Sequence, residues 1–263
     1  GNTTFPRLAW RHAAERPQAP ALREKDLGIW QTLTWHDLKV EVEAIAAGLS
    51  AQGLMRGAHV ALVGENRPRL YAAMIAVQAL GAVPVPMYQD AAAQEMVFVF
   101  ENAEIHYAIV EDQEQVDKML EVRDRYPALG CIVYDDPRGL RNYDRPELFS
   151  YEGLLEMGRG LLKSHPGFVQ AEIDKGSPED AASMFYTSGT TGSPKGVIHT
   201  HRNLISMSTV ASQMEKLTSG EEVLAYLPMA WMGQNIFSYA QWLINGFTVN
   251  CPESQATLTA DMR

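Results

Sequence analysis

The sequence predicts an α/β fold in which largely parallel sheets are flanked by helices. Short apolar runs such as 59–63 and 107–110 are bounded by turn residues, as buried strands of a parallel sheet are. Segments with the apolar spacing of helices separate these runs. Of the 263 residues, 46% are hydrophobic and 21% are charged, which is ordinary globular usage and enough for a sizeable core.

The first part of the chain alternates between the two element types. Apolar residues at 38, 42, 45 and 49 share one face of a helix that follows Thr34. A second helix begins near Pro68, which suits a first turn, and Gly81 stands where a C-terminal glycine cap belongs. The remaining predicted elements are strands at 59–63, 83–87, 107–110 and 130–134, and helices at 94–102 and 112–125.

The second part is less regular until residue 178. Residues 135–178 predict loops around one helix near Leu154. Beyond them the pattern sharpens again, although the last dozen residues predict no closing element. The elements expected there are strands at 181–186, 197–199, 223–227 and 248–251, and helices at 202–215 and 234–245.

Charge and composition exclude several classes of protein. A net charge of −10 argues against a nucleic-acid binder, which needs a basic face. The longest apolar stretch, 70–88, is interrupted by Gly81, Pro84 and Pro86, so it predicts no transmembrane segment. We expect a cytoplasmic protein, and peripheral membrane contact stays open. Cys131 and Cys251 are expected to be apolar fillers in strands.

One segment directly after the strand at 181–186 carries the chemistry. It reads Tyr186-Thr187-Ser188-Gly189-Thr190-Thr191-Gly192-Ser193-Pro194-Lys195-Gly196-Val197. Its glycines allow successive N–H groups to turn toward one anion, and its hydroxyls add donors for phosphate oxygens. Lys195 supplies a cationic point charge, and Pro194 prevents a helix from starting. The segment therefore predicts a phosphate-binding loop.

Two alternatives compete with this interpretation. The P-loop of nucleotide hydrolases requires a glycine before its lysine and a hydroxyl after it, whereas Lys195 is flanked by Pro194 and Gly196. A flexible loop with an incidental lysine is a common use of such residues, but the specific order of the whole run disfavours it. A phosphate binder of another design is preferred.

The run resembles the signature loop of the adenylate-forming superfamily, which includes acyl-CoA synthetases, luciferases and adenylation domains of peptide synthetases. Weaker resemblances flank it in the family's order, at 33–38, 80–86 and 226–231. The stretch 109–118 is similar to long-chain fatty acyl-CoA synthetases. The resemblance spans nearly all of residues 1–263 and implies the N-terminal portion of an AMP-binding domain. We expect a first α/β subdomain over roughly 1–178, and the start of a second over 179–263.

The resemblance implies a two-step ligation. A long-chain fatty carboxylate attacks the α-phosphate of ATP, and the thiol of CoA then displaces AMP from the acyl-adenylate. Residues 187–196 would bind the phosphates, with Lys195 and Thr187 as catalytic residues, and Mg²⁺ would accompany ATP. Trp231 lies in the segment that resembles the acyl pocket, where it either gates an acyl tunnel or is plain core. No metal site made of protein ligands alone is indicated.

The same residues leave other functions open. The activity could instead be another carboxylate-adenylating ligase, for aryl acids or carrier-protein loading, or the chain could be a non-catalytic nucleotide-binding scaffold. His199 and His201 are interpreted as ordinary neighbours of a helix capped by Thr200 or Asn203. The family's adenine, ribose and Mg²⁺ determinants and its catalytic lysine lie downstream of the loop. We therefore expect a truncated chain with little or no ligase activity alone.

Overall fold

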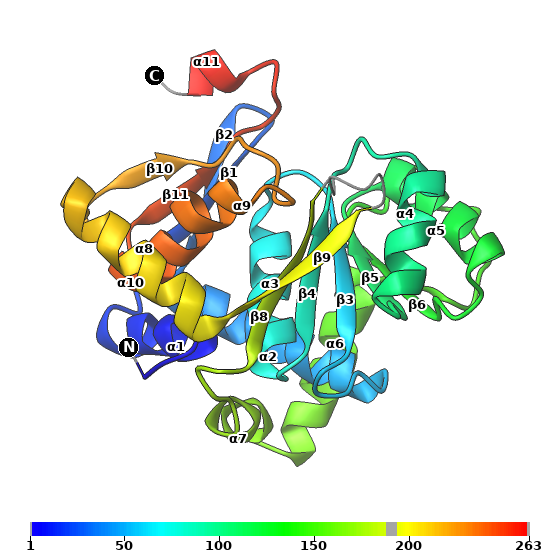
Figure 1. Ribbon diagram of the computed structural model, residues 1–263, viewed down its shortest axis with the longest axis horizontal. Helices are drawn as coiled ribbons and strands as arrows, with labels where there is room; N and C mark the ends of the chain where they lie inside the picture. The colour runs from blue at the N-terminus through cyan, green and yellow to red at the C-terminus, as the bar shows by residue number, and fades with distance from the viewer. Residues whose placement is uncertain (1, 188–193, 262–263) are drawn as a thin grey trace.

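A computed structural model describes residues 2–187 and 194–261 and confirms the layered α/β architecture (Figure 1). Its central sheet has the strand order β4-β3-β5-β6-β7, and all its pairings are parallel. The strands of this sheet are β3 (His59–Val63), β4 (Val83–Met87), β5 (Tyr107–Val110), β6 (Cys131–Tyr134) and β7 (Leu148–Ser150). Four of the five were predicted, and only β7 was missed.

Helices cover both faces of this central sheet, which explains why its strands are apolar throughout. Along β3, Val60 and Leu62 pack into a core shared with one set of helices, and Ala61 and Val63 face the other set. The first set is α2 (Trp35–Ala51), α3 (Pro68–Ala79), α6 (Tyr151–Ser164) and α7 (Phe168–Asp174). The second set is α4 (Ala93–Asn102) and α5 (Gln113–Arg125).

Helix ends follow the local chemistry of the sequence. Thr34 caps α2 through a reciprocal pair of hydrogen bonds with Asp37. Gly81 ends α3 as predicted, with a φ of +68°, and its N–H donates to Gln78 O at 2.9 Å. A Cβ at Gly81 would also displace the end of the flexible Arg56 side chain, but the positive φ is what requires glycine here.

A second sheet joins the two ends of the chain. Its order is β10-β11-β1-β2, with β1 and β2 antiparallel and the other pairings parallel. Its strands are β1 (Pro20–Asp26), β2 (Ile29–Thr34), β10 (Glu222–Leu224) and β11 (Thr248–Cys251). The division near residue 178 stays a prediction, and this sheet takes strands from both sides of it.

The helices around the second sheet include the main differences from the sequence prediction. The helix α1 (Phe5–Glu15) was not predicted, and α8 (His201–Glu215) was. The helix expected at 234–245 is divided into α9 (Met232–Gln234), a π-helical stretch η1 (Asn235–Ala240) and α10 (Gln241–Asn245). The terminal dozen residues contain a short helix, α11 (Leu258–Asp261), so the expectation of no element there was wrong.

Both cysteines lie where the sequence placed them. Cys131 is buried in β6 and Cys251 in β11, and each is a free thiol. Burial raises the pKa of the Cys131 thiol to about 12, and it raises that of Cys251 further. Both therefore behave as small apolar residues in strands.

Candidate functional site

The predicted phosphate loop is carried by a two-stranded antiparallel hairpin. Its strands are β8 (Ala181–Thr187) and β9 (Lys195–Thr200), and in Figure 1 they lie across the front of the central sheet beside β4. Thr187 pairs with Lys195, so the two predicted catalytic residues face each other where the hairpin opens. The interior of the loop, predicted as Ser188, Gly189, Thr190, Thr191, Gly192 and Ser193, lies outside the described residues.

Close packing fixes the end of this hairpin. Gly196 pairs with Tyr186, and a Cβ on Gly196 would lie only 3.1 Å from Cζ of the Tyr186 ring. The Tyr186 hydroxyl donates to Asn102 Oδ1 at 2.6 Å, which ties the hairpin to the end of α4. Gly196 therefore leaves room for the Tyr186 ring, in addition to its predicted contact with phosphate.

Two hollows flank Thr187 and share one wall. The first has a volume of about 520 Å³ and the second of about 320 Å³, within the range of small-molecule sites. The first is lined by Tyr88, Phe185, Tyr186, Thr187, Val197, His199, Ala230, Trp231 and Met232. The second is lined by Pro86, Met87, Tyr88, Ala91, Glu95, Met96, Val99, Tyr186, Thr187, Pro194 and Ala230. Apolar and aromatic groups dominate both, next to the base of the predicted phosphate loop.

Trp231 is a wall of the first hollow. Its side chain is 44% exposed, so the alternative that it is plain core does not hold. A Cβ on Gly233 would stand 2.1 Å from the Trp231 ring, which shows that the indole lies over this glycine. Whether Trp231 gates a tunnel stays a prediction, but it shares a hollow with Thr187.

The charges near the hollows are few. The described lining residues of the two hollows include no Lys or Arg, and Lys195 is the strand partner of the lining residue Thr187. Burial lowers the pKa of His199, which favours its neutral form, and burial raises the pKa of Tyr186. Glu95 in the second hollow is the one carboxylate among the described lining residues.

The structure confirms that the helix after the two histidines is capped as the sequence predicts. Thr200 caps α8, and its hydroxyl accepts from the N–H of Asn203 at 3.2 Å. His201 is buried, and its Nδ1 accepts from the N–H of Phe5 at 3.2 Å. His201 is therefore a structural residue that joins α8 to α1, whereas His199 lines the first hollow.

Several lining residues were missed by the sequence analysis. Tyr88 follows β4 directly, and Met96 and Val99 come from α4. A signal existed for Tyr88, because ligands of open α/β sheets bind beyond the carboxyl ends of parallel strands. Met96 and Val99 gave no such signal, since apolar residues of a helix are expected in the core.

A Mg²⁺ ion carried on phosphate oxygens is compatible with this region. The described residues hold no group of three or more His, Cys, Asp or Glu side chains arranged for a metal ion. Mg²⁺ commonly binds through substrate phosphates and one or two carboxylates.

Within the described ranges, 2–187 and 194–261, no helix is long and apolar enough to cross a membrane.

The amino-acid sequence is similar to those of known enzymes. Residues 9–263 match the AMP-binding enzyme family. The chain is 28% identical over 215 residues to the long-chain-fatty-acid–CoA ligase ACSBG2 of Xenopus laevis, covering 80% of this chain and 28% of that protein. It is 32% identical over 213 residues to the peroxisomal long chain acyl-CoA synthetase 7 of Arabidopsis thaliana, covering 78% and 29%.

The fold is also found among solved structures. An anthranilate CoA ligase, AuaEII, in complex with anthranoyl-AMP superposes with a TM-score of 0.82 at 19% identity, covering 99% of this chain and 47% of that one. This likeness concerns the fold alone. The chain spans less than a third of the length of the two ligases named above.

Proposed function

The chain belongs to the AMP-binding enzyme family, and from that premise we propose that it serves the ATP-dependent activation of a long-chain fatty acid. The carboxylate attacks the α-phosphate of ATP and releases pyrophosphate, and the thiol of CoA then takes the acyl group from the adenylate and releases AMP. The observation that carries the proposal is the position of Thr187 and Lys195, side by side at the edge of two apolar hollows.

The first step must bring a carboxylate up to a polyanion. Backbone N–H groups and hydroxyls of residues 187–196 bind the phosphates, and the ammonium of Lys195 offsets their charge. Mg²⁺ bound with ATP supplies further charge neutralisation. The apolar hollows take the aliphatic chain of the acid, with Trp231 on the wall that it passes. Similarity to long-chain-fatty-acid–CoA ligases supports this choice of acid.

Binding of acids by the chain tests the substrate class. Palmitate is expected to quench or shift tryptophan emission, because Trp231 lines the first hollow, and the Trp231→Phe variant should lose that response. Anthranilate serves as the aryl comparison. Binding of anthranilate in preference to palmitate would favour an aryl-acid ligase, and binding of MgATP with neither acid would favour a scaffold.

Turnover by the chain alone is a separate proposal. Because it spans less than a third of those two ligases, we propose that it has little or no ligase activity by itself. Palmitate-dependent exchange of pyrophosphate into ATP measures this directly. Robust exchange by the purified chain would contradict the proposal.

A further inference from the structure

The segment 226–231 forms part of the wall of both hollows but has little regular structure of its own. It runs as turns and irregular backbone from the end of β10 to the start of α9. It carries Ala230 to both hollows and Trp231 to the first. The position of these two residues therefore depends on bonds that the segment receives from other elements.

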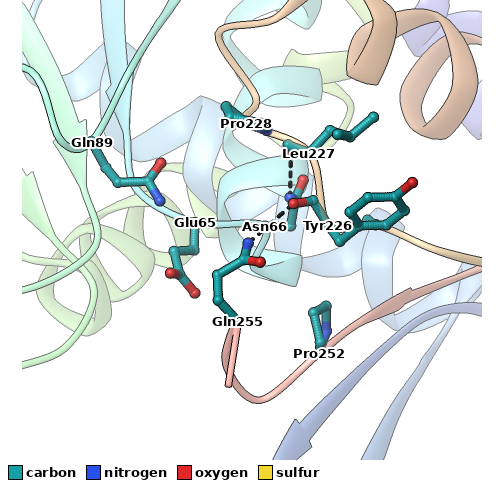
Figure 2. Close-up of a pocket in the computed structure, with 9 residues that line it drawn as sticks. Glu65, Asn66, Gln89, Tyr226, Leu227, Pro228, Pro252 and Gln255 are labelled. Atoms are coloured by element: carbon teal, nitrogen blue, oxygen red, sulfur yellow. Dashed lines mark hydrogen bonds between the residues drawn. The ribbon is translucent and has the colours of Figure 1, made fainter. Parts of the chain in front are cut away.

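Three side-chain amides hold the segment. Asn235 Nδ2, from η1, donates to Met229 O at 2.5 Å and to Trp231 O at 3.4 Å. The other two amides are drawn in Figure 2. Asn66 Nδ2 donates to Leu227 O at 2.8 Å, and Gln255 Nε2 donates to Tyr226 O at 3.1 Å. The bond from Gln255 is exposed, whereas the bond from Asn66 is partly buried. Asn235 lies in η1, just beyond the segment along the chain, so Asn66 is the better shielded of the two amides that reach the segment from elsewhere in the fold.

A closed triangle of buried side chains orients the Asn66 amide. The Tyr71 hydroxyl donates to Asn66 Oδ1 at 2.8 Å, and Gln234 Nε2 donates to the same oxygen at 3.1 Å and to the Tyr71 oxygen at 3.0 Å. Two donors thus face Asn66 Oδ1, so a flipped amide would set its NH₂ against both of them. The triangle leaves the Asn66 NH₂ pointing toward Leu227.

A further part of the lining of the first hollow is held from the same helix. Tyr71 and Gln78 both lie in α3, and Gln78 Nε2 donates to Ala182 O of β8 at 2.8 Å. The strand β8 leads to Phe185 and Thr187 in that part of the lining. The helix α3 and Asn66, which lies just before its N-cap, therefore each anchor one part of the lining of the first hollow.

We propose that Asn66 is a positioning residue for the acyl-binding hollow: through its bond to Leu227 it sets where Ala230 and Trp231 stand relative to Thr187. The nature of the ligand rests on the proposed function, but the anchoring of the 226–231 segment does not. Asn66 touches the segment and not the hollow, since it is absent from the described lining residues of both hollows.

The test compares two changes within the same triangle. Asn66→Asp, measured near pH 8 so that the carboxylate is ionised, keeps the shape and the acceptor but loses the donor to Leu227. Asn66→Ser is a second, neutral variant that is too short to reach Leu227. Tyr71→Phe is the matched control, because it removes the two bonds of the triangle made by the Tyr71 hydroxyl. The bond from Gln234 to Asn66 Oδ1 and the bond from Asn66 to Leu227 stay in place.

The readout is specific to Trp231. Acrylamide quenching of tryptophan emission is measured in each background with and without Trp231→Phe, and the difference reports Trp231 alone. We expect Trp231 to be more readily quenched in both Asn66 variants and unchanged in Tyr71→Phe. Palmitate binding should weaken roughly fivefold in the Asn66 variants, the equivalent of one buried hydrogen bond, and stay within about twofold in Tyr71→Phe.

Three results would overturn the proposal. The acrylamide quenching of Trp231 could be the same in folded Asn66 variants as in the wild type, or it could increase equally in Tyr71→Phe. Loss of folding in both Asn66 variants would show that Asn66 supports the whole fold and not one segment. A wild-type chain that binds no palmitate contradicts the proposed function instead, and the Trp231 quenching still decides the role of Asn66.

Discussion

The buried histidine at the start of α8 makes the stability of the fold sensitive to acid. His201 is 3% exposed, and its Nδ1 accepts from the Phe5 N–H, which links α8 to α1. Burial, and secondarily the charge of Arg7, lowers the His201 pKa to about 4, although Asp180 acts in the opposite direction. Protonation of Nδ1 would also set two N–H groups against each other. We therefore expect the folded state to resist the charge that the unfolded state accepts.

The sign and size of the effect follow from linkage. The folded pKa of about 4 lies below the unfolded value of 6.5, so the stability contributed by His201 is complete above pH 6.5. It is lost as pH falls from 6.5 toward 4. The loss in unfolding free energy is about 2 kcal/mol near pH 5, and it approaches roughly 3.4 kcal/mol below the folded pKa.

Urea unfolding near pH 7 and near pH 5 measures this loss, with His201→Asn as the comparison. Asparagine keeps an acceptor for Phe5 and does not titrate. Burial raises the pKa of carboxyls such as Glu24 and Glu41, and these groups act in the opposite direction in both proteins. The difference between the two proteins therefore isolates His201. Equal losses of stability in the wild type and in His201→Asn would refute the reasoning.

Three further predictions concern packing and thiol chemistry. Gln78→Leu should lower the unfolding free energy by about 2–4 kcal/mol, because the Tyr239 hydroxyl and Ala182 O each lose a buried hydrogen-bond partner. The same change at the exposed Gln170 should cost little. Equal urea midpoints for the two variants would contradict this prediction. Gly158→Ala should lower the unfolding free energy by about 3 kcal/mol or more, since its Cβ would stand 1.8 Å from Ala44 O. Gly160→Ala in the same helix meets nothing within 4 Å and should be neutral or stabilising. Equal thermal midpoints for the two variants would contradict this prediction. Cys131 and Cys251 should react with a thiol reagent only after denaturation, and rapid labelling of the native protein would show that they are accessible.

Much of the central sheet could be predicted because its signals are local. The strands β3 and β5 are buried on both faces, so each reads as a continuous apolar run. The strand β1 was missed because Pro20–Asp26 is largely charged, and only Ala21 and Leu22 are buried. Its parallel partner β11 lies more than two hundred residues away, with Leu22 opposite Val249, and no local pattern reveals such a pairing.

The site could be predicted only in part, for a similar reason. The order of glycines and hydroxyls pointed to residues 187–196, and the register of the hairpin set Thr187 beside Lys195. Asn66 and Gln78 gave no signal, because polar residues next to and within a helix are normally expected at the surface. Their roles depend on partners 104 to 168 positions away in the chain.

The proposed function requires above all that the hairpin loop binds polyphosphate. Equilibrium binding of MgATP, tripolyphosphate and AMP to the chain tests this directly, with Lys195→Ala as the variant and Lys163→Ala, on the exposed part of α6, as its control. We expect ATP and tripolyphosphate to bind more tightly than AMP. Lys195→Ala should weaken the binding of both by about tenfold or more, whereas Lys163→Ala should not. Equal binding of ATP and AMP, or full binding of tripolyphosphate by Lys195→Ala, would contradict this expectation.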